Sequence, residues 1–263
     1  MGNSLLIEVE SRTAILTLNR PERLNALNFE LLEELETVLD QVNRDPDILG
    51  VIITGNGKAF CAGADLKERL SSFTPDSSIA GDAMLSKLRK NLNTIENMGK
   101  PFIAAINGPA YGGGVELALA CDIRIMSPSA KVGLTEPKVG MIPGAGGTQR
   151  LPRLIGMAKA KELLFSAKAI DSSEAYAIGL VNRVVPEGES ILQTSMEWMH
   201  NFQQNAPLAI QMVKLAVNKG GEMSLSQGLD LEAVCSAFLR TTEDRTEGIR
   251  AFQEKRPPKF KGK

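Results

Sequence analysis

Residues 107–121, a glycine-rich corner between two apolar segments, constrain the fold more than any other stretch. Residues 101–106 form a short apolar run that is typical of a buried strand. Gly112, Gly113 and Gly114 follow and lead into residues 117–120, which favour helix. Glycine lets a ligand approach the main chain closely, and a helix start leaves N–H groups without acceptors. The stretch therefore predicts a ligand-binding turn between a strand and a helix.

Two carboxylates are candidates for chemistry. Glu116 is the only charged residue of the 107–121 segment. Its plain interpretation is a first-turn acid that interacts with the helix dipole. A catalytic group is the other interpretation, because an apolar helix has no packing reason to carry a charge. Glu136, fixed beside Pro137, is either a loop acid that faces water or a second catalytic carboxylate.

A second corner of small residues spans residues 59–66, again between a strand and a probable helix. It is either a tight turn with Asp65 as a helix cap, or the source of a second free amide near Ala64. Two backbone N–H groups that converge from separate strand ends would form an oxyanion hole. Cys61 lies in this corner, but no histidine is close in sequence to activate it, so a thiol nucleophile is not expected.

The order of patterns along the chain predicts an α/β fold. Residues 7–18 alternate like a hairpin, an amphipathic helix starts near Asn28, and 50–54 is a buried strand. A helix is expected at 84–98 and strands at 101–106 and 122–127, whereas everything after about residue 190 is helical. Strands alternating with helices indicate a layered α/β core. Residues 71–82 are polar and predicted to be mobile.

Composition limits the function classes. The net charge of −1, from 30 basic and 31 acidic residues, gives no reason to expect nucleic acid or an anionic membrane surface as a partner. Three widely separated cysteines do not form a disulfide framework and suit a reducing compartment. No apolar run approaches the roughly 20 residues of a membrane span, and no signal peptide is visible. A cytoplasmic location, or the matrix of an organelle after removal of a presequence, is therefore expected.

The single histidine, His200, has no cysteine or histidine partner at ligand spacing. A histidine-based nucleophile or a metal site is therefore not expected, and acid–base chemistry would fall to carboxylates. Residues 143–150 are glycine-rich but lack the Lys-Ser/Thr ending of a phosphate-binding loop. They are predicted to be a packing turn.

Taken together, residues 60–67, 111–117, 121–123, 133–137 and 142–150 resemble the enoyl-CoA hydratase/isomerase (crotonase) superfamily. The resemblance runs from residues 19–21 to residues 252–256. It is strongest to bacterial enoyl-CoA hydratases and methylglutaconyl-CoA hydratases. It implies an α/β spiral of ββα repeats in residues 1–200. It also implies a helical region, residues 201–263, that builds a homotrimer or a dimer of trimers.

The resemblance also implies roles for individual residues. The amides of Ala64 and Gly113 would hold the thioester carbonyl as it becomes an enolate. Glu116 would help deprotonate the water that attacks C3, and Glu136 would supply a proton to C2. The acyl-CoA is the expected partner, with coenzyme A as part of the substrate and no separate cofactor. The residues implied in binding it are Arg23, Leu24, Ala64, Asp65, Leu66 and Lys67, with Phe252 and Lys255 contributed by the last helix of a neighbouring subunit. Phe252 and Lys255 are three apart and are predicted to share one face of that helix.

Several alternatives stay open at this point. The presence of both Glu116 and Glu136 favours a hydratase over a Δ3-to-Δ2 isomerase, because such isomerases typically have a carboxylate at only one of these two positions. Methylglutaconyl-CoA hydration is an alternative that the sequence does not separate from other acyl preferences. RNA binding on the same fold is disfavoured by the acidic stretch 33–47, and an inactive scaffold would be expected to lack a glutamate or an oxyanion glycine.

Overall fold

The computed structural model describes residues 4–71 and 82–263. The stretch 71–82, predicted to be mobile, lies outside the described residues apart from its two ends.

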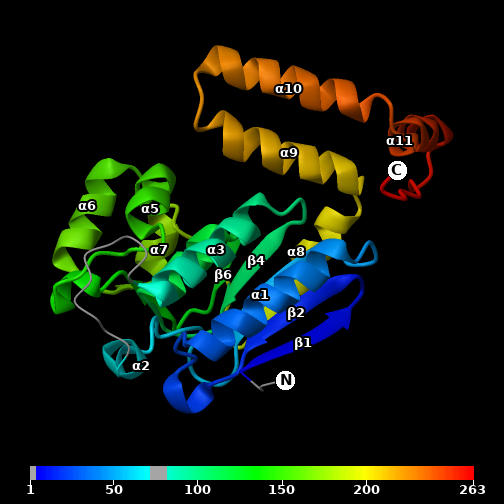
Figure 1. The fold of residues 1–263 in the computed structure, drawn as a ribbon. Coiled ribbons are helices and arrows are strands. Elements are labelled where there is room, and N and C mark those ends of the chain that lie inside the picture. Colours follow the sequence, from blue (N-terminus) through cyan, green and yellow to red (C-terminus); the bar gives the residue numbers. More distant parts are fainter. Residues whose placement is uncertain (1–3, 72–81) are drawn as a thin grey trace.

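The elements alternate as expected for an α/β protein (Figure 1). The strands are β1 (Leu5–Glu10), β2 (Thr13–Leu18), β3 (Gly50–Gly55), β4 (Phe102–Ile106), β5 (Ala110–Tyr111), β6 (Ile123–Met126), β7 (Lys131–Gly133), β8 (Ile170–Asp171) and β9 (Arg183–Val184). The helices up to the middle of the chain are η1 (Pro21–Arg23), α1 (Phe29–Arg44), α2 (Leu66–Ser71), α3 (Ala83–Asn97), α4 (Gly113–Ala120) and η3 (Glu136–Val139). The later helices are α5 (Gly147–Ile155), α6 (Met157–Ser166), α7 (Ser172–Ala177), α8 (Ile191–Gln203), α9 (Pro207–Gly220), α10 (Leu225–Leu239) and α11 (Glu243–Glu254).

The main sheet has six strands in the order β1-β2-β3-β4-β6-β9. The β1–β2 hairpin is antiparallel and the other pairs are parallel, with Ile52 opposite Ile15 on one side and Ile103 on the other. Strands β3 and β4 are buried along their whole length. Parallel strands that are buried on both faces are continuous apolar runs, which explains why these two were recognisable in the sequence.

Helices cover both faces of this sheet. On one face, α1 and α3 pack over the larger apolar core. On the other face, Ile52 and Ile103 pack against α8, which contacts β3, β4 and β6. A β-carbon at Gly50 would lie 2.2 Å from the sulfur of Met199 in α8, so this glycine is what lets α8 lie so close.

A second sheet has three strands in the order β5-β7-β8, and β5 and β7 follow the carboxyl ends of β4 and β6 along the chain. The chain repeats one pattern here, a main-sheet strand, a short strand and a helix, first as β4-β5-α4 and then as β6-β7-α5 with the short η3 before α5. Ligands of open α/β sheets bind at the carboxyl ends of the strands. Both glycine corners of the sequence lie at that end.

Local signals account for several helix starts. The Asn28 side chain accepts a hydrogen bond from Leu31 N and caps α1. Asp171 caps α7, Ser224 forms a capping box at α10, and Thr242 caps α11. The helix start predicted near Asn28 is confirmed, and the other three helices begin at caps of the same kind.

The C-terminal helices extend away from the sheet (Figure 1). Helix α9 is attached through Lys214, whose Nζ donates to Ile95 O, Lys100 O and Asp122 Oδ2 at 2.8–3.0 Å. Helix α10 packs on α9. Since α8 belongs to the core and ends at Gln203, the predicted division after residue 200 falls inside α8. Within the described parts of the chain, no helix is long and apolar enough to cross a membrane.

Candidate active site

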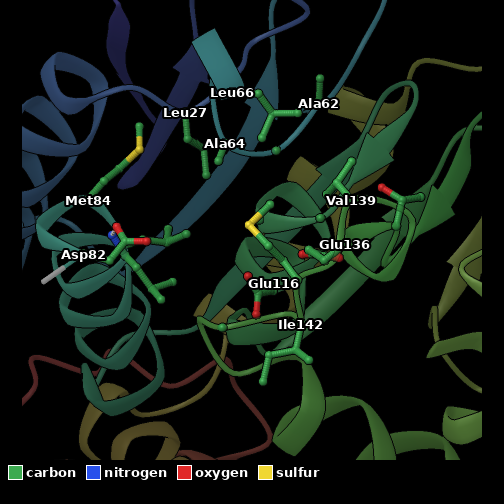
Figure 2. A pocket seen from close by; sticks show the side chains of 18 of the residues that line it. Leu27, Ala62, Ala64, Leu66, Asp82, Met84, Glu116, Glu136, Val139 and Ile142 are labelled. Atoms are coloured by element: carbon green, nitrogen blue, oxygen red, sulfur yellow. Dashed lines mark hydrogen bonds between the residues drawn. The ribbon is translucent and has the colours of Figure 1, made fainter. Parts of the chain in front are cut away.

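A cavity of about 270 Å³ opens beyond the carboxyl ends of β3 and β4 (Figure 2). Its wall combines apolar side chains with a few polar groups. The residues that line it are Leu27, Leu32, Ala62, Gly63, Ala64, Leu66, Asp82, Met84, Leu85, Leu88, Gly112, Gly113, Glu116, Thr135, Glu136, Lys138, Val139, Met141, Ile142 and Gly144. All four predicted chemical positions, Ala64, Gly113, Glu116 and Glu136, are among them.

Two backbone N–H groups face this cavity. Leu27 N donates to Gly63 O and Asp65 N donates to Leu27 O, so the N–H of the intervening Ala64 points away from Leu27. Gly113 is the first residue of α4, where an N–H has no acceptor within the helix. In the described part of the chain, no backbone carbonyl outside regular elements accepts either N–H.

The two amides are close together because the two corners pack backbone against backbone. A β-carbon at Gly63 would lie 2.7 Å from Tyr111 O and 3.3 Å from Gly113 N, and φ is +92° at this glycine. A β-carbon at Gly113 would lie 3.7 Å from Ala64 N. At position 63 only glycine permits this approach, whereas the contact at position 113 is of ordinary length. The two corners predicted separately from the sequence therefore form one site.

Glu116 is buried, with 2% of its surface exposed, and its carboxylate is held by the main chain. Its Oε1 accepts hydrogen bonds from Ala145 N at 2.7 Å and Gly147 N at 2.8 Å. Burial raises the pKa of Glu116, while these two N–H groups and the cations Arg150 and Arg89 oppose the rise. The carboxylate is thus desolvated yet supplied with donors, as a buried base requires.

The sequence analysis missed this anchor. Residues 143–150 were predicted to be a packing turn, but two of their N–H groups hold Glu116. The signal was present, since Gly146 and Gly147 start helix α5 in the same way that Gly112 and Gly113 start α4. The same argument for free amides at a helix start applies to both.

Glu136 reaches the cavity from the short sheet. Gly112 N donates to Gly133 O, which brings the segment after β7 against the glycine corner. Glu136 then opens η3, and a β-carbon at Gly112 would lie 3.1 Å from its Oε1. Figure 2 shows the Glu116 and Glu136 side chains at the wall of the cavity, with the apolar Val139 and Ile142 nearby. The two carboxylates therefore face one space.

Most of the predicted coenzyme A contacts lie at one rim. Arg23 ends η1 and Leu24 follows it; both are exposed, and Leu24 O accepts a hydrogen bond from Ala62 N beside the cavity. Leu66 and Lys67 are exposed at the start of α2. 

Asp65 is engaged within the chain. Its Oδ2 pairs with Arg20 at 3.1 Å, and its Oδ1 accepts from Lys67 N at 3.3 Å, as a cap of α2 does. The sequence analysis predicted the cap but missed the arginine.

Phe252 and Lys255 lie elsewhere. Phe252 is 85% exposed in α11, which Figure 1 places far from α2. The prediction that the two residues share a helix face is wrong, because α11 ends at Glu254 and Lys255 takes a left-handed backbone with φ of 54°. Their contribution to a neighbouring subunit's site stays a prediction.

Other chemistries find no support at this site. Burial raises the pKa of the Cys61 thiol to about 12, so it is not a nucleophile at neutral pH. Among residues 4–71 and 82–263, no group of three or more His, Cys, Asp or Glu side chains is arranged to hold a metal ion.

Comparison with known proteins covers nearly the whole chain. The family model for enoyl-CoA hydratase/isomerase matches residues 8–263. The mitochondrial methylglutaconyl-CoA hydratase of Mus musculus is 46% identical over 261 residues, covering 97% of this chain and 82% of that protein. The short-chain-enoyl-CoA hydratase of Clostridium acetobutylicum is 42% identical over 255 residues, covering 97% of this chain and 96% of that protein.

The solved structures support the fold independently. The crystal structure of an enoyl-CoA hydratase from Bacillus anthracis matches with a TM-score of 0.94 at 42% identity, covering 99% of this chain and 100% of that one. The predicted crotonase fold is therefore confirmed. With the family model, the relatives and the fold in agreement, the chain belongs to the enoyl-CoA hydratase/isomerase (crotonase) family.

Proposed function

We propose that the protein is an enoyl-CoA hydratase, which adds water across the C2–C3 double bond of a trans-2-enoyl-CoA to give a 3-hydroxyacyl-CoA. One observation carries the proposal: Glu116 and Glu136 line the same cavity as the free amides of Ala64 and Gly113. Two carboxylates suit the addition of water, which needs one group to accept a proton and another to donate one.

In the proposed mechanism the thioester carbonyl oxygen accepts hydrogen bonds from Ala64 N–H and Gly113 N–H. Water attacks C3 and loses a proton to Glu116, while the electrons of the double bond move onto the thioester as an enolate. The two N–H groups stabilise the oxygen of that enolate. Glu136 then transfers a proton to C2, which completes the addition.

The coenzyme A handle is proposed to lie along the rim formed by Arg23, Leu24 and residues 64–67. We further propose that the C-terminal helices assemble trimers, so that Phe252 and Lys255 of a neighbouring chain complete this rim. What supports the assembly is the row of exposed apolar side chains on α9 and α10, among them Val217 and Leu225 at 69% and 80% exposure.

The experiment that tests the proposed reaction follows the loss of conjugated-thioester absorbance with crotonyl-CoA. Rapid loss with the wild type, absent from a Glu116→Gln/Glu136→Gln double variant, is the expected result. No turnover of crotonyl-CoA, or equal turnover by the double variant, would contradict the proposal.

A dicarboxylic substrate such as methylglutaconyl-CoA is the second candidate, and Lys138 favours it. Lys138 lines the cavity two residues after Glu136, next to Val139. Its ammonium group forms no ion pair or side-chain hydrogen bond with any other described residue. A cation beside the acyl site suits a second carboxylate at the far end of the acyl group. The methylglutaconyl-CoA hydratases among the relatives agree with this choice.

Lys138→Met is expected to separate the two substrate classes. It keeps the length of the side chain and removes the charge, so kcat/KM for methylglutaconyl-CoA should fall about 10- to 100-fold, the effect of one charged hydrogen bond. The value for crotonyl-CoA should stay within about twofold. Lys131→Met, an exposed lysine of β7 outside the cavity, is the matched control. Equal losses for both substrates, or none, would contradict a carboxylate-binding role.

A further inference from the structure

The Glu116 carboxylate is held by the loop of residues 145–147. Arg150 connects this loop to helix α3. Its side chain is 14% exposed. Nη1 donates to Ala145 O at 3.0 Å, and Nη2 donates to Asn93 Oδ1 at 3.0 Å and to Glu96 Oε2 at 2.6 Å. One planar guanidinium group thus connects the start of α5 to the end of α3, a geometry that the fork of an arginine provides and a lysine does not.

This guanidinium lies directly on the loop backbone. A β-carbon at Gly146, where φ is +118°, would lie 2.1 Å from Nη1 of Arg150. Gly146 separates Ala145 and Gly147, the two residues whose N–H groups hold Glu116 Oε1. Moving Arg150 would therefore free the segment that carries both donors.

Arg89 supports the same loop from α3. Its Nε donates to Gly144 O at 2.6 Å. Gly144 C=O and Ala145 N–H belong to one peptide group, so Arg89 binds one end of the peptide whose other end binds Glu116. Hydrogen bonds in such a chain polarise one another. Arg89 is exposed, however, whereas Arg150 is mostly enclosed, so Arg150 constrains the loop more tightly.

We infer that Arg150 is a positioning residue, which fixes the direction of the Glu116 carboxylate through the backbone of residues 145–147. The role rests on the proposed function, in which Glu116 accepts a proton from the attacking water. Glu96 and Asn93 hold the guanidinium in place, and the loop transmits that position to the base.

The charged groups around Glu116 give the sign of a pH effect. Arg150 on α5 and Arg89 on α3 lower the pKa of Glu116 against the larger rise from burial. Glu136 on η3 lines the same cavity, as do Asp82 and Lys138. Removing Arg150 takes away a cation and loosens two donors, and both changes raise the pKa of Glu116. Since the base acts as a carboxylate, the rise of kcat with pH should move to higher pH.

Arg150→Met tests the inference, with Arg153→Met as its control. Arg153 lies on the same helix and, among residues 4–71 and 82–263, its guanidinium group donates only to Gln149 O and Oε1. Arg150→Met should lower kcat about 10- to 100-fold, the effect of a misplaced catalytic group, with KM changed little. The acid limb of the kcat–pH profile of Arg150→Met should shift to higher pH. Arg153→Met should change neither. A wild-type pH profile and kcat in Arg150→Met would overturn the inference.

A double-mutant cycle shows whether Arg150 acts through Glu116. In a Glu116→Gln background the further change Arg150→Met should cost less than about twofold in kcat, whereas in a Glu136→Gln background it should cost its full amount. An equal cost in both backgrounds would indicate a structural role and overturn the inference. Arg150→Lys, which keeps the charge without the fork, replaces Arg150→Met throughout if that variant does not fold.

A crystal structure of Arg150→Met separates failure of this inference from failure of the proposed function. If the wild type does not hydrate crotonyl-CoA, the function is wrong, but the two distances from Glu116 Oε1 can still be measured. If the distances from Glu116 Oε1 to Ala145 N and Gly147 N exceed hydrogen-bond range in Arg150→Met but not in Arg153→Met, the positioning role is supported. Distances that stay at 2.7 and 2.8 Å overturn it.

Discussion

Glu136→Gln is expected to lower kcat for crotonyl-CoA hydration by about 10²- to 10⁴-fold, the contribution of a positioned general acid. Glutamine has nearly the same shape, so the contact between this side chain and Gly112 should persist. An amide has no proton that it can readily give to C2, which is why the loss should appear in kcat. Stopped-flow absorbance with the conjugated thioester would measure it.

Binding separates loss of chemistry from loss of structure in this variant. The dissociation constant of a saturated acyl-CoA should change less than about threefold, because Glu136 contributes a proton and little binding energy. Glu189→Gln, in an exposed loop outside the cavity, is the matched control and should behave as the wild type. Near-normal turnover by Glu136→Gln would rule out the acid role.

Gly113→Pro is expected to lower kcat by about 10²- to 10³-fold, as loss of one oxyanion donor does. Proline has no N–H, and it is tolerated at the first position of a helix, which Gly113 occupies in α4. The variant should therefore fold while lacking one of the two donors. Circular dichroism and thermal unfolding would check the fold before kcat is measured.

Gly113→Ala is the control that keeps the N–H. Its β-carbon would lie 3.2 Å from Leu27 Cδ1 and 3.3 Å from Leu88 Cδ2, both at the ends of side chains that can shift. Alanine should accordingly cost less than about tenfold in kcat, well below the proline variant. A folded Gly113→Pro protein with the kcat of Gly113→Ala would show that this amide does not stabilise the enolate.

The parts of the fold that the sequence predicted are those with local causes. Asn28 caps α1 through Leu31 N, and the buried strands β3 and β4 are continuous apolar runs. The two glycine corners were predictable because a run of small residues before a helix has few other uses. Each of these signals lies within about ten residues of the chain, the range over which propensity and capping act.

The parts that were not predicted depend on partners that are distant in sequence. The bonds to Glu116 join residues 29 and 31 positions apart, and Arg20 reaches Asp65 across 45 positions. No local pattern specifies such a pairing. The prediction that Lys255 shares a helix face with Phe252 was wrong for a different reason. Spacing in the sequence cannot show that the helix ends one residue before Lys255.

The succession of backbone links at the site has a consequence for folding. Leu27 binds the 63–65 segment, Tyr111 N binds Cys61 O, and Gly112 N binds Gly133 O. Contacts between segments this far apart close large loops and tend to form late. The amides of Ala64 and Gly113 both lie in the chain up to the start of α4. The N–H donors to Glu116 belong instead to the segment that starts α5.

Until α5 docks, a compact intermediate would have to leave the Glu116 carboxylate in water or bury it without its donors. Burying an unpaired carboxylate is strongly unfavourable, so α4 and α5 are expected to settle onto the sheet together. Refolding protein should therefore regain its helices before it regains activity, because Glu116 reaches its final surroundings only when α4 and α5 dock together.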